Sequence, residues 1–283
     1  MNIIIPLGGK GERFKKEGYA LPKPLIKVLD KEIIFYVLDN LNLESNDIIF
    51  IIYNKELEHF DFENIIKSKY YSNINSNINF IKLDSDTKGA SETINIGIKH
   101  ILNNIEINNI NNKTILIDGD TFYTQDILSK YRNTADPWRT CLESGDAGYS
   151  RTDGFCFSWS LRKTPQQNAV FYTKNTDPKP VFSYIKLDNI NNTNNIIEIK
   201  EKIKISDNAN TGAYCFNSIH QLLYYSQYVL DNNIQFNNEC YTSCIIHEMI
   251  KQKEPFVGIE LNSNNVHVLG TPIQVEEFIQ KNK

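Results

Sequence analysis

Residues 2–14 read Asn2-Ile3-Ile4-Ile5-Pro6-Leu7-Gly8-Gly9-Lys10-Gly11-Glu12-Arg13-Phe14, and we expect the rest of the chain to be organised around them. The part up to Leu7 is mostly apolar and β-branched, which predicts a short buried strand. The three glycines that follow let the backbone turn tightly and come close to a ligand. Free N–H groups in such a loop, at the start of a helix, form a natural cradle for an anion.

Two basic side chains belong to this region. Arg13 can clamp a phosphate through two parallel hydrogen bonds, and Lys23 can add a compact positive charge. Pro22 and Pro24 flank Lys23 and hold its backbone extended, so the lysine is aimed rather than freely solvated. The spacing is neither that of a P-loop nor that of a dinucleotide fingerprint. The glycines alone would also suit a plain tight turn, but the whole combination predicts a site for a polyphosphate.

The glycine-rich loop followed by Pro22-Lys23-Pro24-Leu25 resembles the signature of the sugar-1-phosphate nucleotidylyltransferases, also called nucleotide-sugar pyrophosphorylases. The resemblance implies that the loop binds the nucleotide, through the residues Leu7, Gly8, Gly9 and Gly11. It also implies that Arg13 holds nucleotide phosphates and that Lys23 serves the reaction centre, both as catalytic residues.

The composition excludes several other classes of protein. The chain has 283 residues, of which 41% are hydrophobic and 23% charged, as in ordinary globular proteins. A net charge of −4 gives no basic surface, so nucleic acid is not expected as a partner. No apolar run is long enough to span a bilayer, and the first residues do not resemble a signal peptide. Five scattered cysteines favour a reducing compartment, so we expect a cytoplasmic protein.

Strand-like and helix-like patterns alternate in the first half of the chain. The patterns predict strands over residues 2–7, 48–53, 78–83 and 113–117, and helices over residues 32–43, 55–70 and 90–102. This alternation predicts a parallel sheet that is covered on both faces. Ligands on such sheets bind at the carboxyl ends of the strands, where the loops after residues 7, 83 and 117 fall.

The second half predicts a mixed or antiparallel extension of the same sheet. It contains short strand patterns at 168–173, 181–187, 196–200, 211–216, 256–261 and 266–269, and helical patterns at 218–229, 239–251 and after Pro272. Because no linker divides the chain, we expect one α/β domain over residues 1–283. Its parts would be a nucleotide-binding half (1–132), an insertion (134–163) and an acceptor-binding half (164–283). The resemblance implies a Rossmann-like, GT-A-like three-layer nucleotidyltransferase domain with a mixed, mostly parallel central sheet.

A pair of carboxylates follows the strand expected at 113–117, in the sequence Asp118-Gly119-Asp120. A carboxylate at this point can hold Mg²⁺, which in turn bridges nucleotide phosphates. The same residues would also suit an ordinary turn. The resemblance favours the metal role for Asp120, because the metal-binding aspartate of the family lies here. Asp118 is expected to lie further from the metal ion than Asp120 and to support Asp120 rather than bind the ion directly.

Three other segments match the family. Lys88-Gly89-Ala90 lies where the family contacts the base and ribose, although Thr87 or Ser91 could equally be a plain helix cap. Glu201-Lys202 matches a pair that contacts the acceptor sugar and its phosphate, with Ile203 in place of the usual proline; a charge run of this kind is otherwise an ordinary solvated face. Gly212 matches the glycine that lets the acceptor approach.

One departure from the family concerns the metal. Members commonly have a second metal-binding aspartate two residues before the glycine of Gly-Thr-Pro, but here Val268 precedes Gly270-Thr271-Pro272. A branch linked to capsular polysaccharide synthesis also tends to lack that acid. The segments Phe182–Asp188 and Asn238–Tyr241 resemble the same branch, which is therefore the closest match.

Two features have no clear family counterpart. The segment 134–163 holds Trp138, Cys141, Cys156 and Trp159, and we expect it to pack over the acceptor side, to form a subunit contact in a homo-oligomer, or to be a self-packed loop. Cys240, Cys244 and His247 would share one face of a helix. Buried free cysteines are more common there than a metal site, which needs a fourth ligand.

These observations predict an enzyme that joins a nucleoside triphosphate to a sugar 1-phosphate or similar phosphorylated acceptor, with Mg²⁺ as cofactor and pyrophosphate as product. The base could be uracil, cytosine or thymine. One alternative is a glycosyltransferase that uses a nucleotide sugar, for which Asp118-Gly119-Asp120 would be the Asp-x-Asp motif. Another is a non-catalytic nucleotide-binding regulatory subunit, which Val268 would suit.

Overall fold

Strand β1 (Asn2–Leu7) lies inside the sheet with a neighbour on each side. β4 (Ile48–Asn54) and β6 (Thr114–Ile117) pair with it in parallel, and β5 (Asn77–Leu83) pairs in parallel with β4. The computed structural model describes residues 1–70, 77–104, 113–134, 167–188 and 194–283. The segment 134–163, for which an insertion was expected, therefore falls almost entirely outside the described residues.

The apolar run of β1 fills both faces of the sheet. Ile3 and Ile5 belong to one hydrophobic core, whereas Ile4 between them belongs to a second core on the opposite face. Successive side chains of a strand point to opposite faces, so a continuous apolar run is what a strand buried on both sides requires. All three isoleucine side chains are fully buried.

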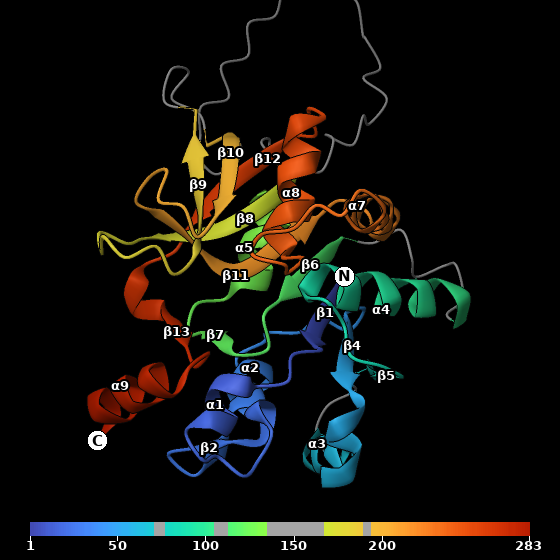
Figure 1. Cartoon of the computed structure of the whole chain (residues 1–283), viewed down its shortest axis with the longest axis vertical. Helices are drawn as coiled ribbons and strands as arrows, with labels where there is room; N and C mark the ends of the chain where they lie inside the picture. The colour runs from blue at the N-terminus through green and yellow to red at the C-terminus, as the bar shows by residue number, and fades with distance from the viewer. Residues whose placement is uncertain (71–76, 105–112, 135–166, 189–193) are drawn as a thin grey trace, which may run out of the picture.

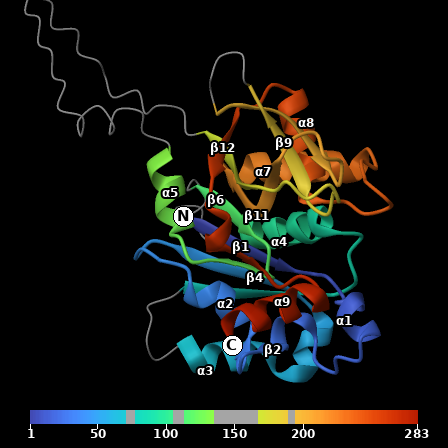
Figure 2. The same ribbon diagram turned by 90° about the vertical axis from the view of Figure 1, so that its left-hand side faces the viewer.

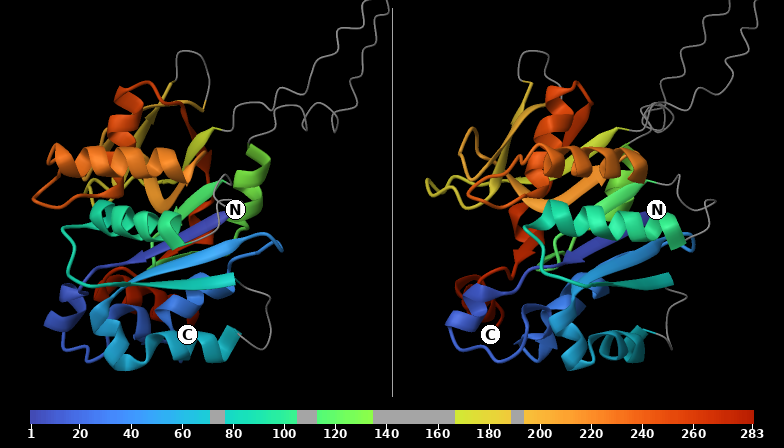
Figure 3. Two further views of the ribbon diagram at one scale, coloured as in Figure 1. Left: turned by 90° about the vertical axis from the view of Figure 1, so that its right-hand side faces the viewer. Right: turned by 45° about the vertical axis from the view of Figure 1, so that its right-hand side comes forward.

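Helices cover both faces of the sheet and give three layers (Figures 1 and 3). The first core is closed by α2 (Ile33–Asp39), α3 (Phe62–Tyr70), α5 (Ile127–Thr134) and the carboxyl-terminal α9 (Pro272–Asn282). The second is closed by α4 (Ala90–Asn104), α7 (Ile219–Asp231) and α8 (Thr242–Lys251). Figure 2 shows α9 beside α2, although the two helices come from opposite ends of the chain. Among the described helices, none has the length and apolar character needed to cross a bilayer.

The second half of the chain extends the sheet beyond β6. β11 (Asn208–Phe216) pairs antiparallel with β6 and also with β8 (Asn168–Lys174), and β12 (Phe256–Glu260) pairs parallel with β8. The hairpin of β9 (Ser183–Leu187) and β10 (Ile196–Glu201) joins through β9. Within this sheet all strands except β10 and β11 run in the direction of β1. The expected α/β fold with a mixed, mostly parallel sheet is confirmed.

Short elements connect the longer ones. They are α1 (Glu12–Lys16), a 3-10 turn (Lys23–Leu25), β2 (Lys27–Val28), β3 (Lys31–Glu32), a 3-10 helix (Lys55–Phe60), β7 (Thr121–Tyr123), a 3-10 turn (Ser263–Asn265) and β13 (Val266–Val268). Two predicted helices have different bounds from those expected. The helix expected over 55–70 is divided at Asp61, whose backbone is left-handed (φ 54°), and the helix expected from residue 239 begins only at Thr242.

Gly97 lies where α4 packs against β4, and a Cβ built on it would be 2.1 Å from Cδ1 of the buried Ile52. We expect Gly97→Ala to lower the free energy of unfolding by about 1–3 kcal/mol, because overpacking costs more than the gain of about 1 kcal/mol in helix propensity. Urea unfolding measures the change. Ile96→Ala, on the exposed side of α4, is the control. A Gly97→Ala protein as stable as wild type would show that helix and strand can separate at no cost.

Candidate active site

The loop after β1 brings its glycines next to Lys23. Gly11 has a left-handed backbone (φ 65°) and directly precedes α1, whose start receives no side-chain cap within the described residues. A Cβ on Gly11 would lie 3.4 Å from Cβ of Lys23, so the two segments are in contact. Pro22 has an extended backbone (φ −63°, ψ 147°), but Lys23 begins a 3-10 turn (Lys23–Leu25), so the expectation that the two prolines hold Lys23 extended is wrong. The N–H of Leu25 donates to the Pro22 carbonyl (2.9 Å) and closes the chain into this turn. The loop and the lysine therefore share one end of the sheet.

An ion pair joins Lys23 to Asp120, although 97 residues separate them in the chain. The Nζ atom of Lys23 donates to Oδ2 of Asp120, and both side chains are partly buried (24% and 23% exposed). β1 and β6 are parallel neighbours, so the segments after them emerge at the same edge of the sheet. Two of the residues predicted as catalytic are thus in direct contact.

The second carboxylate, Asp118, is influenced by the charge of Lys23 but forms no ion pair with it among the described residues. Burial and next the charge of Asp120 raise the pKa of Asp118 well above its ordinary value. Burial also favours the neutral form of Asp120, but the charge and hydrogen bond of Lys23 outweigh this and lower the pKa of Asp120. Lys23 thus stabilises the ionised form of Asp120, whereas burial and the neighbouring acid favour the neutral form of Asp118.

Three glycines leave space around these acids. Gly212 on β11 has a left-handed backbone (φ 87°), and a Cβ on it would lie 2.7 Å from Oδ2 of Asp118. A Cβ on Gly270 would lie 3.0 Å from Oδ2 of Asp120, and one on Gly119 would meet Cδ2 of Leu7 at 2.0 Å. Close approach of the backbone is therefore the physical reason for glycine at each of these positions.

The expected acceptor residues lie at the end of β10 and face α8. The Nζ atom of Lys202 donates to the hydroxyl oxygen of Tyr241 (2.5 Å), and Ser243 donates to the Glu201 carboxylate (2.7 Å). Burial raises the pKa of Glu201. The charge of Glu201 also acts on Asp118, which places the two carboxylates within electrostatic range. The structure thus connects the acceptor residues to the pair of acids after β6.

The expected base-binding segment lies against residues from far along the chain. Gly89 is in an unusual backbone conformation (φ 142°), and a Cβ there would lie 2.7 Å from the carbonyl oxygen of Cys240. The N–H of Lys88 donates to Glu92 (2.5 Å), and Ala90 begins α4. Gly8 packs against the side chains of Thr87 and Thr93.

Arg13 and Gly9 are the predicted residues with the most open surroundings. Arg13 is exposed on α1, and a Cβ on Gly9 would have no atom within 4 Å. Burial and Glu239 raise the pKa of Tyr241, while the charge of Arg13 opposes them, so Arg13 is within electrostatic range of Tyr241. Arg13 is not part of the Lys23–Asp120 ion pair.

Val268, at the position where the sequence resemblance implied a second acid, lies near Asp120. β13 pairs antiparallel with β7 so that Val268 is opposite Thr121, and the N–H of Leu269 donates to the Asp120 carbonyl (2.7 Å). Within the described part of the chain, no three His, Cys, Asp or Glu side chains gather as a metal site. This includes Cys240, Cys244 and His247, whose common helical face is lost because Cys240 precedes α8.

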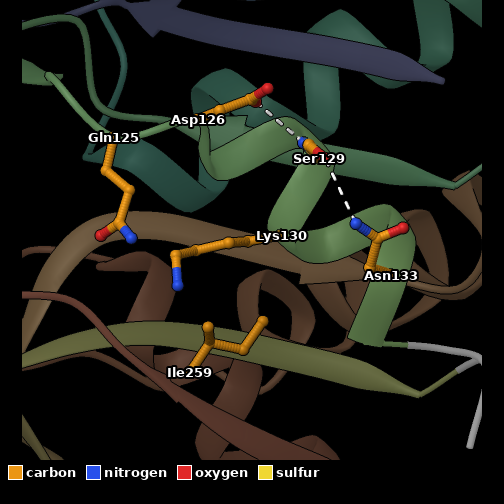
Figure 4. A pocket seen from close by; sticks show the side chains of 6 residues that line it. All are labelled: Gln125, Asp126, Ser129, Lys130, Asn133 and Ile259. Atoms are coloured by element: carbon orange, nitrogen blue, oxygen red, sulfur yellow. Dashed lines mark hydrogen bonds between the residues drawn. The ribbon is translucent and has the colours of Figure 1, made fainter. Parts of the chain in front are cut away.

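Sequence reasoning assigned no role to Tyr241, Ser243 or Asn54. The Asn54 amide donates to the Gly8 carbonyl (3.4 Å) and to Asp86 (3.1 Å), which in turn pairs with Lys10 (2.8 Å). The segment ending at Tyr241 matched a family motif in the sequence, but its contacts with Lys202 depend on the folded chain. A separate pocket on the surface is lined by Gln125, Asp126, Ser129, Lys130, Asn133 and Ile259 (Figure 4). It contains none of the predicted site residues.

Comparison with known proteins supports this picture. Residues 2–140 match the model of the nucleotidyl transferase family. No curated protein sequence was found to match the chain.

Several solved structures share the fold over almost the whole chain. A nucleoside-diphosphate-sugar pyrophosphorylase from Vibrio cholerae RC9 superposes with a TM-score of 0.75 at 16% identity, covering 98% of this chain and 99% of the other. A UDP-glucose pyrophosphorylase in complex with UDP-glucose gives 0.68 at 15% identity, covering 99% and 97%. The inositol-1-phosphate CTP transferase from T. maritima gives 0.61 at 13% identity, covering 99% and 94%. At these identities the likeness shows the fold alone.

Gly212 gives a direct test of the packing around Asp118. We expect Gly212→Ala to reduce the free energy of unfolding by about 1–3 kcal/mol, because the new methyl group overlaps a carboxylate oxygen and the left-handed backbone disfavours alanine. Chemical denaturation measures this. Gly9→Ala is the matched control, since space is open there and the expected change is within about 0.5 kcal/mol. Equal stabilities of the two variants would contradict the close packing of Gly212 on Asp118.

Proposed function

Since its residues 2–140 match the model of the nucleotidyl transferase family, we propose that this chain joins a nucleoside triphosphate to a sugar 1-phosphate, or a similar phosphorylated acceptor, and releases pyrophosphate. An oxygen of the acceptor phosphate attacks the α-phosphorus and forms a new P–O bond. The bond from the α-phosphorus to the bridging oxygen breaks, and pyrophosphate leaves with that electron pair. Positioning and charge neutralisation carry such a reaction, because the protein has little covalent chemistry to do.

The contact between Lys23 and Asp120 is the observation that supports this proposal most. It places a cation from the loop after β1 and a carboxylate from the end of β6 at one point. Asp118 and Glu201 are within electrostatic range of the same point. A transfer between two phosphorylated substrates needs such a set of opposite charges, with donors for phosphates and acids that can hold a metal.

On the nucleotide side, the loop after β1 and the segments near it would bind different parts of the triphosphate. The N–H groups of Gly8, Gly9 and Gly11, with the Arg13 guanidinium, would hold the β- and γ-phosphates. Lys23 would stabilise negative charge at the α-phosphorus as the bond forms. Leu7 would support the loop, and the segment Lys88, Gly89 and Ala90 would contact the base and ribose.

On the acceptor side, Lys202 would hold the acceptor phosphate and Glu201 would accept hydrogen bonds from sugar hydroxyls. Gly212 would let the acceptor come close to β11, and its missing side chain also lets the backbone of β11 pack directly against Asp118. Ile203, which replaces the usual proline, is 48% exposed beside Lys202, so the surface next to the phosphate site is apolar.

The residues present fit a bound Mg²⁺. Asp120, with Asp118 near it, supplies the hard oxygen ligands that Mg²⁺ prefers, and Gly212 and Gly270 leave room around them. Mg²⁺ usually retains water and needs only one or two carboxylates together with substrate phosphates, so valine at position 268 does not prevent binding. When bound, the ion would neutralise phosphate charge.

The biological setting is part of the proposal. The sequence resemblance to the capsular branch supports a role in nucleotide-sugar supply for a surface polysaccharide, in the cytoplasm. The similar structures carry names that include a nucleoside-diphosphate-sugar pyrophosphorylase and an inositol-1-phosphate CTP transferase, which supports a phosphorylated acceptor and leaves its identity to experiment. A homo-oligomer is compatible with these features.

A matrix of triphosphates against phosphorylated acceptors tests the proposal. UTP, CTP and dTTP are each combined with a panel of sugar 1-phosphates and other phosphorylated metabolites in the presence of Mg²⁺, and pyrophosphate release is measured. We expect one pair to give turnover. A glycosyltransferase would instead consume a ready-made nucleotide sugar, and a regulatory subunit would bind a triphosphate without turnover across the whole panel. Either result would contradict the proposed reaction.

Lys23 and Asp120 should be essential for turnover but not for folding. We expect Lys23→Ala and Asp120→Ala each to lower kcat/KM by about 100- to 1,000-fold, because each removes charge stabilisation at the reacting phosphate. Pyrophosphate release measures the rate, and circular dichroism checks the fold.

Lys27→Ala and Asp231→Asn are the matched controls, since both residues are exposed on the surface. We expect them to retain wild-type rates. Wild-type rates in the Lys23 and Asp120 variants would show that their roles are assigned incorrectly.

A further inference from the structure

The segment that leads into α8 contacts both expected substrate sites. It comprises Glu239, Cys240 and Tyr241, followed by the first residues of the helix. This segment belongs neither to the loop after β1 nor to the pair Glu201-Lys202, and the proposed reaction assigns no role to it. Its contacts run in two directions, one toward the segment 88–91 and one toward the end of β10.

Toward the nucleotide side, the backbone of this segment forms a short ladder. The N–H of Cys240 donates to the Lys88 carbonyl (3.1 Å), and the N–H of Ser91 donates to the Cys240 carbonyl (2.9 Å). The Ser91 hydroxyl donates to the Tyr241 carbonyl (2.7 Å). Gly89 lies so close that a side chain there would overlap Cys240. The backbone of Tyr241 is therefore held in a fixed position relative to the base-binding segment.

Toward the acceptor side, the side chain of Tyr241 holds Lys202. The Lys202 ammonium donates to the Tyr241 hydroxyl (2.5 Å) and lies 4.3 Å from the centroid of the Tyr241 ring. The Glu239 carboxylate faces the same hydroxyl and adds negative charge beside it. Ser243, two residues after Tyr241, donates to Glu201. Both expected acceptor residues thus have a hydrogen-bond partner from this one segment.

A fixed partner matters because lysine is a flexible side chain. Four rotatable bonds separate the ammonium from the backbone, and rotamer entropy is lost when such a side chain is ordered. Lys202 also has a left-handed backbone (φ 49°), which is uncommon for a residue with a side chain. A hydroxyl on a rigid ring orders the ammonium before the acceptor arrives, so less entropy remains to be lost on binding.

We propose that Tyr241 is a positioning residue that holds the Lys202 ammonium in place for the acceptor phosphate. This inference rests on the proposed function, because it assumes that Lys202 binds the acceptor. Tyr241 acts through Lys202 and touches neither reacting atom. Since Ser91 and Cys240 anchor the backbone at Tyr241, Lys202 is held at a defined distance from the base-binding segment.

Tyr241→Phe removes the hydroxyl and keeps the ring, so the packing at the start of α8 is retained. With the substrate pair found in the matrix, we expect KM for the acceptor to rise about 5- to 20-fold, because rotamer entropy of Lys202 must then be lost when the acceptor binds. We expect KM for the triphosphate and kcat to stay within about twofold. Tyr224→Phe, at a 60% exposed tyrosine on α7, is the matched control and should leave all three constants unchanged.

A double-mutant cycle shows whether Tyr241 acts through Lys202. In a Lys202→Met background, Tyr241→Phe should add no further increase in the acceptor KM, whereas independent roles would give additive effects. A second readout needs no substrate. Acylation of Lys202 by a limiting amine reagent, quantified by mass spectrometry, should be faster in Tyr241→Phe than in Tyr224→Phe.

Each outcome has a definite meaning. If wild type turns over but Tyr241→Phe matches Tyr224→Phe in acceptor KM, the positioning role is wrong and the proposed function stands. Additive effects in the cycle, or unchanged acylation of Lys202, also overturn the positioning role. If wild type turns over no pair in the matrix, the proposed function fails and the acceptor role of Lys202 fails with it, whatever the acylation shows.

Discussion

The site depends on one electrostatic contact, the ion pair between Lys23 and Asp120. Each partner by itself would be costly to withdraw from water, and together they satisfy each other at the edge of the sheet. The contact is only available because β1 and β6 are parallel neighbours whose ends lie side by side. Asp118 lies beside this pair, and burial and the charge of Asp120 raise its pKa even though the charge of Lys23 opposes them. A divalent cation bound here would favour the ionised form of Asp118.

Glycine serves here mainly by taking up little space. Gly119, Gly212 and Gly270 each lie where a side chain would overlap Leu7 or one of the two acids. Backbone from β11 and from the segment before α9 therefore reaches the carboxylates directly. Three segments far apart in sequence can converge on a small volume only if they have no side chains at the point of contact. The glycines thus determine how closely these backbone segments approach Asp118 and Asp120.

The same sheet also joins the two halves of the chain. β11 pairs with β6 at one end and carries Gly212 to Asp118, while β10 ends at Glu201 and Lys202. The segment before α8 connects this acceptor side to the base-binding segment through backbone hydrogen bonds. Nucleotide and acceptor residues are therefore parts of one continuous framework, in which a small shift of α8 would move Lys202 relative to the loop after β1.

Local patterns in the sequence were sufficient for the α/β fold, because the spacing of apolar residues distinguishes strands from helices and parallel strands place their ligands at one edge. The motifs after β1 and β6 likewise indicated the class of enzyme. Local patterns did not predict three features: the division of the expected helix at Asp61, the start of α8 at Thr242, and the hydrogen bond between Lys202 and Tyr241. Each depends on backbone strain or on partners far along the chain, such as Lys88 and Ser91 for Cys240. Only the tertiary structure brings such residues together, because a local sequence pattern does not indicate which distant residue a side chain will contact.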